Sequence, residues 1–222
     1  MKNKVLYFFI FLLSHSSLFA TSLEIKSKII TLDKKKNISI FENDVVIKTN
    51  TGETLKSDYA EYDKKKEFLI LKNNISVKDK EGNFVQANYA EYNEKNKIFK
   101  STGSTKILTN ENYIIESSNI LFDRKKNLIL SENDTEIIDK DKNSIFLPNF
   151  EFLIKKNIFK SVGEINIEDT LGNNYQFSQI YIDTIKKEIL GTDAKAFLNN
   201  KIFKEHENNK PRIFSNTIKL SG

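Results

Sequence analysis

The chain has 222 residues, a length typical of a single domain, and 35 Lys and Arg against 30 Asp and Glu. The excess of +5 falls to +3 when Lys2 and Lys4 at the N-terminus are set aside, which disfavours nucleic-acid binding through a strong phosphate footprint. Cysteine is absent and only two histidines are present, so we expect no disulfide, cofactor or metal site and no enzymatic activity.

The N-terminus has the composition of a secretory signal peptide. Two lysines precede an unbroken apolar run, Val5 to Leu13, and small and polar residues up to Ala20 end it. The run is too short to span a bilayer comfortably, although an uncleaved anchor is an alternative. We therefore expect a signal peptide over residues 1–20 and one domain over 21–222 that works outside the cytoplasm.

A strict repeat of 30 residues follows the leader. It is clearest in the tyrosine-containing segments 58–63 and 88–93, and the same step continues in both directions without insertion. One apolar column consists of Leu32, Tyr62, Tyr92, Phe122, Phe152 and Ile182. The next column is polar and consists of Asp33, Asp63, Asn93, Asp123 and Asp183, broken by Leu153. The polar column, followed by lysines, predicts a turn in each unit.

Each unit predicts one strand out and one strand back, both bent in the middle. Apolar residues alternate with period two, and the apolar parity flips inside the outward strand, which requires a bulge or a sharp bend. Residues that tolerate positive φ interrupt the return strand at Asn43, Asn73, Gly103, Asn133, Gly163 and Asp193. A second turn closes the unit at Gly52, Gly82, Asn112 and Gly172. The predicted fold is all-β, a twisted antiparallel β-jellyroll folded over itself into two packed sheets.

The regularity breaks after Phe197. A polar stretch up to Lys210 is followed by Pro211 to Leu220, which resembles the start of another unit, and Gly222 falls where the next polar turn is due. We expect the natural polypeptide to continue past Gly222 with further repeats or a barrel.

The repeating pattern, legible in Ala87 to Ile107 and present from about Ile25 onward, resembles the OstA-like family of the lipopolysaccharide transport (Lpt) system. The resemblance implies a β-jellyroll whose inner groove holds lipopolysaccharide acyl chains, with successive jellyrolls joined edge to edge across the periplasm. Segment 209–213 and the end in mid-repeat favour the N-terminal periplasmic domain of the outer-membrane member LptD over the soluble LptA and the anchored LptC. The chain contains no barrel, and it lacks the cysteines that link domain to barrel in some members.

The inward columns are the candidate lipid site. The predicted groove residues are Ile47, Val77, Ile107, Ile137, Ile167, Phe197, Tyr62, Tyr92, Phe122 and Phe152. Apolar area removed from water stabilises a complex by about 25 cal/mol per Å², so such a groove could shield acyl chains. The alternative is an ordinary closed sandwich core, as in a purely structural β-solenoid.

Two further surfaces are candidates for contacts. The open edges of the meander, with Ile25 and Ser27 at one end and Ile213 and Ser215 at the other, are predicted to accept other Lpt proteins by strand addition. Lysines cluster at the first turn of each unit, where they either contact lipid phosphates or simply keep the turns soluble. The expected partners are therefore lipopolysaccharide, other Lpt proteins and the outer membrane, with no nucleic acid.

Overall fold

The computed structural model describes residues 24–48, 52–78, 80, 82–110, 112–183, 185–186, 188–199 and 211–221. The predicted signal peptide and the polar stretch 201–210 lie outside these residues. The described part of the chain is all-β, as predicted, and its one helical element is the 3-10 turn η1 (Ile154–Lys156). Within these ranges there is no helix long and apolar enough to cross a membrane.

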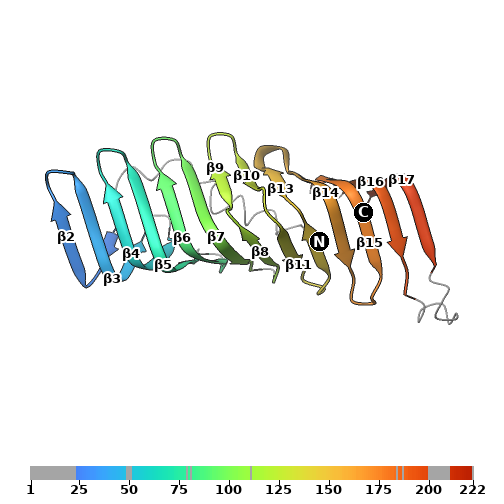
Figure 1. Ribbon diagram of the computed structural model, residues 1–222, viewed down its shortest axis with the longest axis horizontal. Helices are drawn as coiled ribbons and strands as arrows, with labels where there is room; N and C mark the ends of the chain where they lie inside the picture. The colour runs from blue at the N-terminus through green and yellow to red at the C-terminus, as the bar shows by residue number, and fades with distance from the viewer. Residues whose placement is uncertain are drawn as a thin grey trace.

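The strands follow one another along the chain with short connections. In chain order they are β1 (Glu24–Lys26), β2 (Ile29–Asp33), β3 (Ile38–Lys48), β4 (Thr54–Asp63), β5 (Phe68–Lys78), β6 (Phe84–Asn93), β7 (Ile98–Leu108), β8 (Ile114–Ser118), β9 (Leu121–Asp123), β10 (Leu128–Ser131), β11 (Thr135–Ile138), β12 (Ser144–Leu147), β13 (Phe150–Leu153), β14 (Ile158–Glu168), β15 (Asn174–Asp183), β16 (Glu188–Phe197) and β17 (Arg212–Ser221). Neighbouring strands pair antiparallel, and Figure 1 shows them in one long row from β2 at one end to β17 at the other.

Every unit bends at the same place, which we call the corner. The ladder between β4 and β5 shifts register between Lys56 and Tyr59, and the ladder between β14 and β15 shifts between Val162 and Ile165. In other units the strand is split at the corner, so that β9 and β8 pair with opposite halves of β7. The corner therefore divides the sheet into a first wall, which contains β2, β9, β10 and β13, and a second wall, which contains β1, β8, β11 and β12.

The predicted bend residues explain the corner. Positive φ angles occur at Asn43, Asn73, Gly103, Gly163 and Asp193, as the sequence predicted. Asn133 instead lies in the gap between β10 and β11, where the strand stops and starts again. A bulge with a left-handed residue turns the chain and reverses which side chains face inward.

The turns at the free end of the first wall stack on one another. In the turn after β4, the Asp63 carboxylate accepts hydrogen bonds from the backbone N–H groups of Lys65 and Lys66 at 3.0 and 2.9 Å. Consecutive turns are also joined, because the Lys64 N–H donates to the Asn37 carbonyl at 3.0 Å. The carbonyl acceptors belong to a left-handed column that the sequence analysis missed: Asn37, Glu67, Lys97 and Asn127.

The inward side chains form two apolar clusters between the walls. The N-terminal cluster contains the buried residues Val45, Ile47, Ala60, Leu69, Leu71, Ile75, Ala87 and Ala90. The larger cluster contains Ile107, Ile115, Ile120, Phe122, Ile129, Leu147, Phe150, Phe152, Ile154, Ile165 and Ile180. Phe99 packs against both clusters, so the interior is continuous along the row of strands.

Candidate functional site

Small side chains line the inside of the corner. Ala60, Ala90 and Ser101 are fully buried, with 0% of their surface exposed. Side chains this small let the two walls meet closely. Tyr62 lies two residues beyond Ala60 on the same face of β4 and is half-buried, whereas Phe122 and Phe152 at the equivalent position are buried.

Buried hydroxyl groups pair with one another at the central corner. Thr105 Oγ1 donates to Ser101 Oγ at 2.8 Å, and Ser117 Oγ donates to Ser131 Oγ at 2.9 Å and lies 2.8 Å from Thr135 Oγ1. Because each hydroxyl has a partner, burying these polar groups costs little free energy. This arrangement is a structural network that joins neighbouring strands at the corner.

The predicted groove residues fall into two sets by burial. Four of them are almost completely buried, with exposed fractions of 2% to 5%: Ile47, Ile107, Phe122 and Phe152. Five others are half-buried: Val77, Ile137, Ile167, Tyr62 and Tyr92. These nine side chains share the inner face, but in this structure they pack as a core with access from solvent only at the half-buried positions.

The prediction for Phe197 is wrong. In β16 the inward side chains are Gly191 and Ala194, three residues apart, whereas the inward pair Ser101 and Thr105 in β7 is four apart. The corner of β16 is therefore one residue shorter, and the rest of the strand is displaced by one position. Phe197 consequently lies on the outer face, 6.2 Å from Phe214 between ring centroids.

The N-terminal edge of the sheet is formed by β1 and β2. Ile25 is half-buried and packs against the N-terminal cluster, whereas Ile30 and Leu32 of β2 are exposed on the inner face. Ser27 connects the two strands, and its hydroxyl donates to the Ile29 carbonyl at 2.8 Å. Among the described strands, β1 and β2 pair only with β3, so their outer backbone groups face away from the sheet.

The C-terminal edge is β17, which pairs with β16 in the described part of the chain. Its Ser215 hydroxyl donates to the Thr217 carbonyl at 2.6 Å, which is the same contact that Ser27 and Ser57 make two residues ahead in their own units. This match supports the prediction that β17 begins another repeat. Ile213 is 59% exposed, so both predicted edges present apolar side chains.

Two turn aspartates of the first wall, Asp63 and Asp183, are held in their charged form. The backbone N–H of Lys66, together with its ammonium group 3.2 Å away, keeps the pKa of Asp63 below its ordinary value. Lys186 lowers the pKa of Asp183 in the same way. The lysine three residues after the aspartate is thus paired with it inside the same turn.

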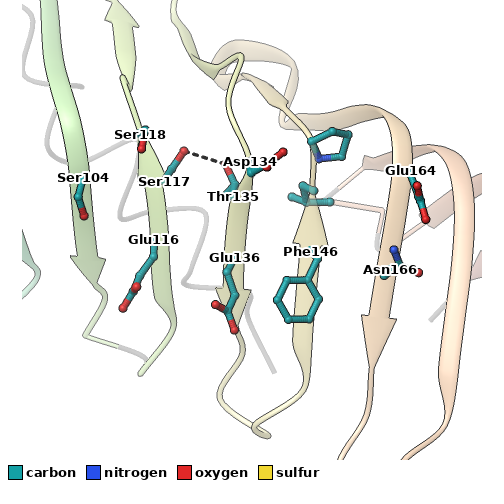
Figure 2. A pocket seen from close by; sticks show the side chains of 12 residues that line it. Ser104, Glu116, Ser117, Ser118, Asp134, Thr135, Glu136, Phe146, Glu164 and Asn166 are labelled. Carbon is teal, nitrogen blue, oxygen red and sulfur yellow. Dashed lines mark hydrogen bonds between the residues drawn. The ribbon is translucent and has the colours of Figure 1, made fainter.

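A pocket of about 600 Å³ lies on the outer face of the second wall, at the corner. Figure 2 shows its lining residues on β7, β8, β11, β12 and β14, including Glu116, Glu136, Phe146 and Glu164. The sequence analysis did not find this pocket, although three lining residues, Ser104, Asp134 and Glu164, are 30 residues apart. No described group of three or more His, Asp and Glu residues is arranged to hold a metal ion.

Comparisons with known proteins give weak likenesses. No protein-family model and no curated protein matches the chain. Among solved structures, LptH, the LptA homologous periplasmic component of the lipopolysaccharide transport device from Pseudomonas aeruginosa, is 10% identical with a TM-score of 0.19. The comparison covers 76% of this chain and 80% of LptH. The TCP10 domain of Danio rerio CPAP, solved with a STIL peptide, is 8% identical with a TM-score of 0.14, over 68% of this chain and 96% of that one. These values are too low to support a functional argument.

Proposed function

We propose that the chain is a periplasmic lipid-transport module of the OstA-like type, which carries lipopolysaccharide acyl chains between its two walls toward the outer membrane. The observation that carries this proposal is the repeated inner face, where a 30-residue pattern places apolar side chains along the whole row of strands. A ladder of similar sites lets a lipid move stepwise without a single deep trap. The same pattern is the basis of the resemblance in sequence.

The half-buried positions give a route for the lipid. Near the free ends of the strands, Ile47 and Ile107 are buried, whereas Val77 and Ile137 remain partly accessible. An acyl chain would enter between the free ends of the two walls and part them. An acyl chain between the walls would displace contacts between their apolar side chains. The free energy gained by burying the acyl chain would offset this loss, because both quantities scale with buried apolar area.

The sheet edges fit the same proposal. A lipid bridge needs modules whose interiors join, and strand addition at β1, β2 or β17 would extend the interior into a neighbouring module. We infer that the N-terminal edge meets another Lpt protein, and that the module is the N-terminal domain of an LptD-like protein, with a soluble LptA-like bridge as the alternative. In this proposal the first 20 residues direct secretion.

Site-specific photo-cross-linking tests the proposal in living cells. A photoreactive residue at Val77, on the inner face of β5, should form a lipopolysaccharide adduct. Ser76 is the matched control, because it is the neighbouring half-buried residue on the outer face of the same strand. The pair Ile137 and Glu136 on β11 repeats the comparison in the larger cluster.

A purely structural repeat is the second candidate function. It is favoured by the nearly complete burial of Ile47, Ile107, Phe122 and Phe152, which is what a closed core requires. In the cross-linking experiment this candidate predicts no lipid adduct at Val77 or Ile137 in a protein that is folded by circular dichroism. Such a result would eliminate the lipid-transport proposal.

A further inference from the structure

The pocket on the outer face of the second wall contains a pair of like charges. Glu116 of β8 and Glu136 of β11 are directly opposite each other in the antiparallel ladder, so their side chains are neighbours on the outer face. Figure 2 shows these two glutamates side by side. Because like charges at directly opposite positions destabilise a sheet, the fold carries an unfavourable contact among the residues that line this pocket.

The negative charge belongs to the pocket and not to the repeat. Cross-strand partners connect the outer side chains of the second wall into one row, which carries Lys56 and Lys106 on the N-terminal side of the pair. On the C-terminal side the same row continues through Gln176 to Lys195. Within the described strands, the acidic members of this row are the two adjacent glutamates, and its other charged members are basic.

The two glutamates differ in their partners. Lys106 Nζ lies 2.5 Å from Glu116 Oε1, on the side of Glu116 that faces away from Glu136. Glu136 is half-buried and forms no hydrogen bond or ion pair with a described residue. The fold therefore neutralises one carboxylate of the pair and leaves the other to an external cation.

Two further carboxylates line the pocket at the corner. Asp134 and Glu164 are 30 residues apart and form no hydrogen bond or ion pair within the described part of the chain. Asp44 holds the same position in the first unit, where its carboxylate lies 2.5 Å from Lys28 Nζ. The position can thus be paired within the fold, and in the pocket units it is not.

An exposed aromatic ring adjoins the glutamate pair. Phe146 of β12 is directly opposite Glu136 in the ladder, and 42% of its surface is exposed. A guanidinium group against this ring would be attracted to its π electrons and could donate to the Glu136 carboxylate at the same time, since cross-strand neighbours are about 5 Å apart. Arginine combines a planar stacking group with several fixed donors, whereas lysine offers a point charge. Arginine is therefore the cationic side chain that fits this position best.

The pocket has room for more than one side chain. Its volume of about 600 Å³ is within the usual range for ligand sites. Asp134 precedes Glu136 by two residues in the chain, a separation of about 7 Å along an extended backbone. A bound chain in an extended conformation places alternate side chains at the same spacing, so a second cation two residues from the first would reach Asp134.

We propose that this pocket binds an extended segment of a partner protein that carries two arginines two residues apart, one at Phe146 and Glu136 and the other at Asp134. The complementary charge steers such a segment to the pocket and sets its register. The inference goes beyond the proposed function and does not depend on it, because the pocket faces away from the interior that would hold a lipid.

Three synthetic peptides test the inference on the full chain. The probe is acetyl-Gly-Gly-Arg-Gly-Arg-Gly-Gly-amide, and the two comparison peptides carry citrulline or lysine in place of both arginines. Titrations followed by amide chemical shifts in nuclear magnetic resonance measure each affinity and locate the site. We expect the arginine peptide to shift the amides of Glu136 and Phe146. The lysine peptide should bind about two- to fivefold more weakly, because it loses the contact with the ring, and the neutral citrulline peptide weakest of all.

Substitutions in the pocket separate binding from structure. Glu136→Gln should weaken binding of the arginine peptide about threefold and leave the urea midpoint unchanged or higher, because it removes the repulsion from Glu116. Glu168→Gln is the matched control, since Glu168 is an exposed carboxylate of β14 that does not line the pocket. Phe146→Leu should abolish the preference for arginine over lysine. A lower urea midpoint for Glu136→Gln, or equal weakening in Glu168→Gln, would overturn the inference.

The remaining outcomes are equally decisive. If the arginine and citrulline peptides bind with the same affinity, or if the shifted amides are spread over other faces, the pocket does not recognise a cation and the inference fails. If spermidine binds more tightly than the arginine peptide and shifts the same amides, the site takes a small polyamine, and the partner-protein part is wrong. Failure here leaves the lipid-transport proposal untouched, because none of these measurements involves the interior.

Discussion

The N-terminal and central units build the same corner in different ways. In the N-terminal units β4 and β6 run through the corner as continuous strands, and of their inner corner residues Ala60, Ala87 and Ala90 are apolar. The buried Ser57 donates its hydroxyl to the Tyr59 carbonyl of its own strand. In the central units three consecutive strands are split, and buried hydroxyls pair at the corner. The backbone N–H and C=O groups of a bend can therefore be hydrogen-bonded in two ways within one repeat: by the neighbouring strand, or by side chains.

The contrast is sharpest in one column of the repeat. Tyr59 and Tyr89 occupy it in the N-terminal units, where each hydroxyl donates to a glutamate two residues ahead on the outer face. Asn119 and Asn149 occupy it in the central units, where the amides cross to the return strand at the corner. The same position therefore has two roles. In a continuous strand it carries a tyrosine that bonds to a side chain of its own strand, and in a split strand it carries an asparagine that bonds to the backbone of the neighbouring strand.

The largest expected effect distinguishes the packing of the two clusters. Phe152 is 5% exposed in the larger cluster, so Phe152→Ala should lower the free energy of unfolding by about 3–5 kcal/mol. Tyr62 holds the equivalent position in the N-terminal region and is half-buried, so Tyr62→Ala should cost clearly less. Urea denaturation of both variants measures the difference, and equal losses of stability would show that the two clusters are packed alike.

Two glycines of the bend column give the next comparison. Gly163 has φ of +123°, and a Cβ there would lie 2.7 Å from Pro148 Cγ in the split corner. Gly103 has φ of +79°, and a Cβ there would meet no atom within 4 Å. We expect Gly163→Ala to cost about 2–3 kcal/mol and Gly103→Ala about 1 kcal/mol in thermal or urea unfolding. A larger loss for Gly103→Ala would contradict this account of the corner.

The bridging amide should have a smaller effect. Asn149 Nδ2 donates to the Val162 carbonyl at 2.6 Å, and its Oδ1 accepts from the Val162 N–H at 3.2 Å. Asn149→Ala should cost about 1 kcal/mol, because water can replace part of these bonds at an exposed site. Tyr89→Phe, at the equivalent N-terminal position, removes a single hydrogen bond to Glu91 and should cost less. If the two variants unfold at the same urea concentration, the amide bridge does not stabilise the split corner.

The smallest effect concerns alkaline pH and the N-terminal tyrosines. Burial and Glu61 raise the pKa of Tyr59 to about 12, and Glu91 and burial raise the pKa of Tyr89 to about 12. Since a raised pKa favours the protonated folded state, this stabilisation is complete below about pH 10 and is lost as the pH rises toward about 12. Ultraviolet difference absorbance should show both phenols ionising late.

Glu91→Gln provides the matched test for Tyr89. Replacing the carboxylate by a neutral amide should bring the ionisation of Tyr89 closer to the ordinary value, while Tyr59 remains unchanged. An unshifted titration curve would mean that Glu91 does not contribute to the raised pKa of Tyr89.

Much of the fold could be predicted because the rules involved are local. The Asp63 turn, the left-handed bend residues such as Asn43 and the alternation along each strand depend on neighbours in the chain. The interior column was predictable for the same reason up to Ile167. The prediction failed at Phe197, because the corner of β16 is one residue shorter. The sequence held a signal of this change: the charged Lys195 is 30 residues after the inward, buried Ile165.

The sequence by itself determined the repeat, the turns and the apolar inner faces of the two walls, since these follow from residue type and spacing. Only the tertiary structure decided how far the walls close over Ile107, which lysines pair with a carboxylate, and that the outer face carries a pocket between β8 and β14. These features depend on the register between strands and on the fit of side chains from distant units. A change of one residue at a corner alters that register without disturbing any local pattern.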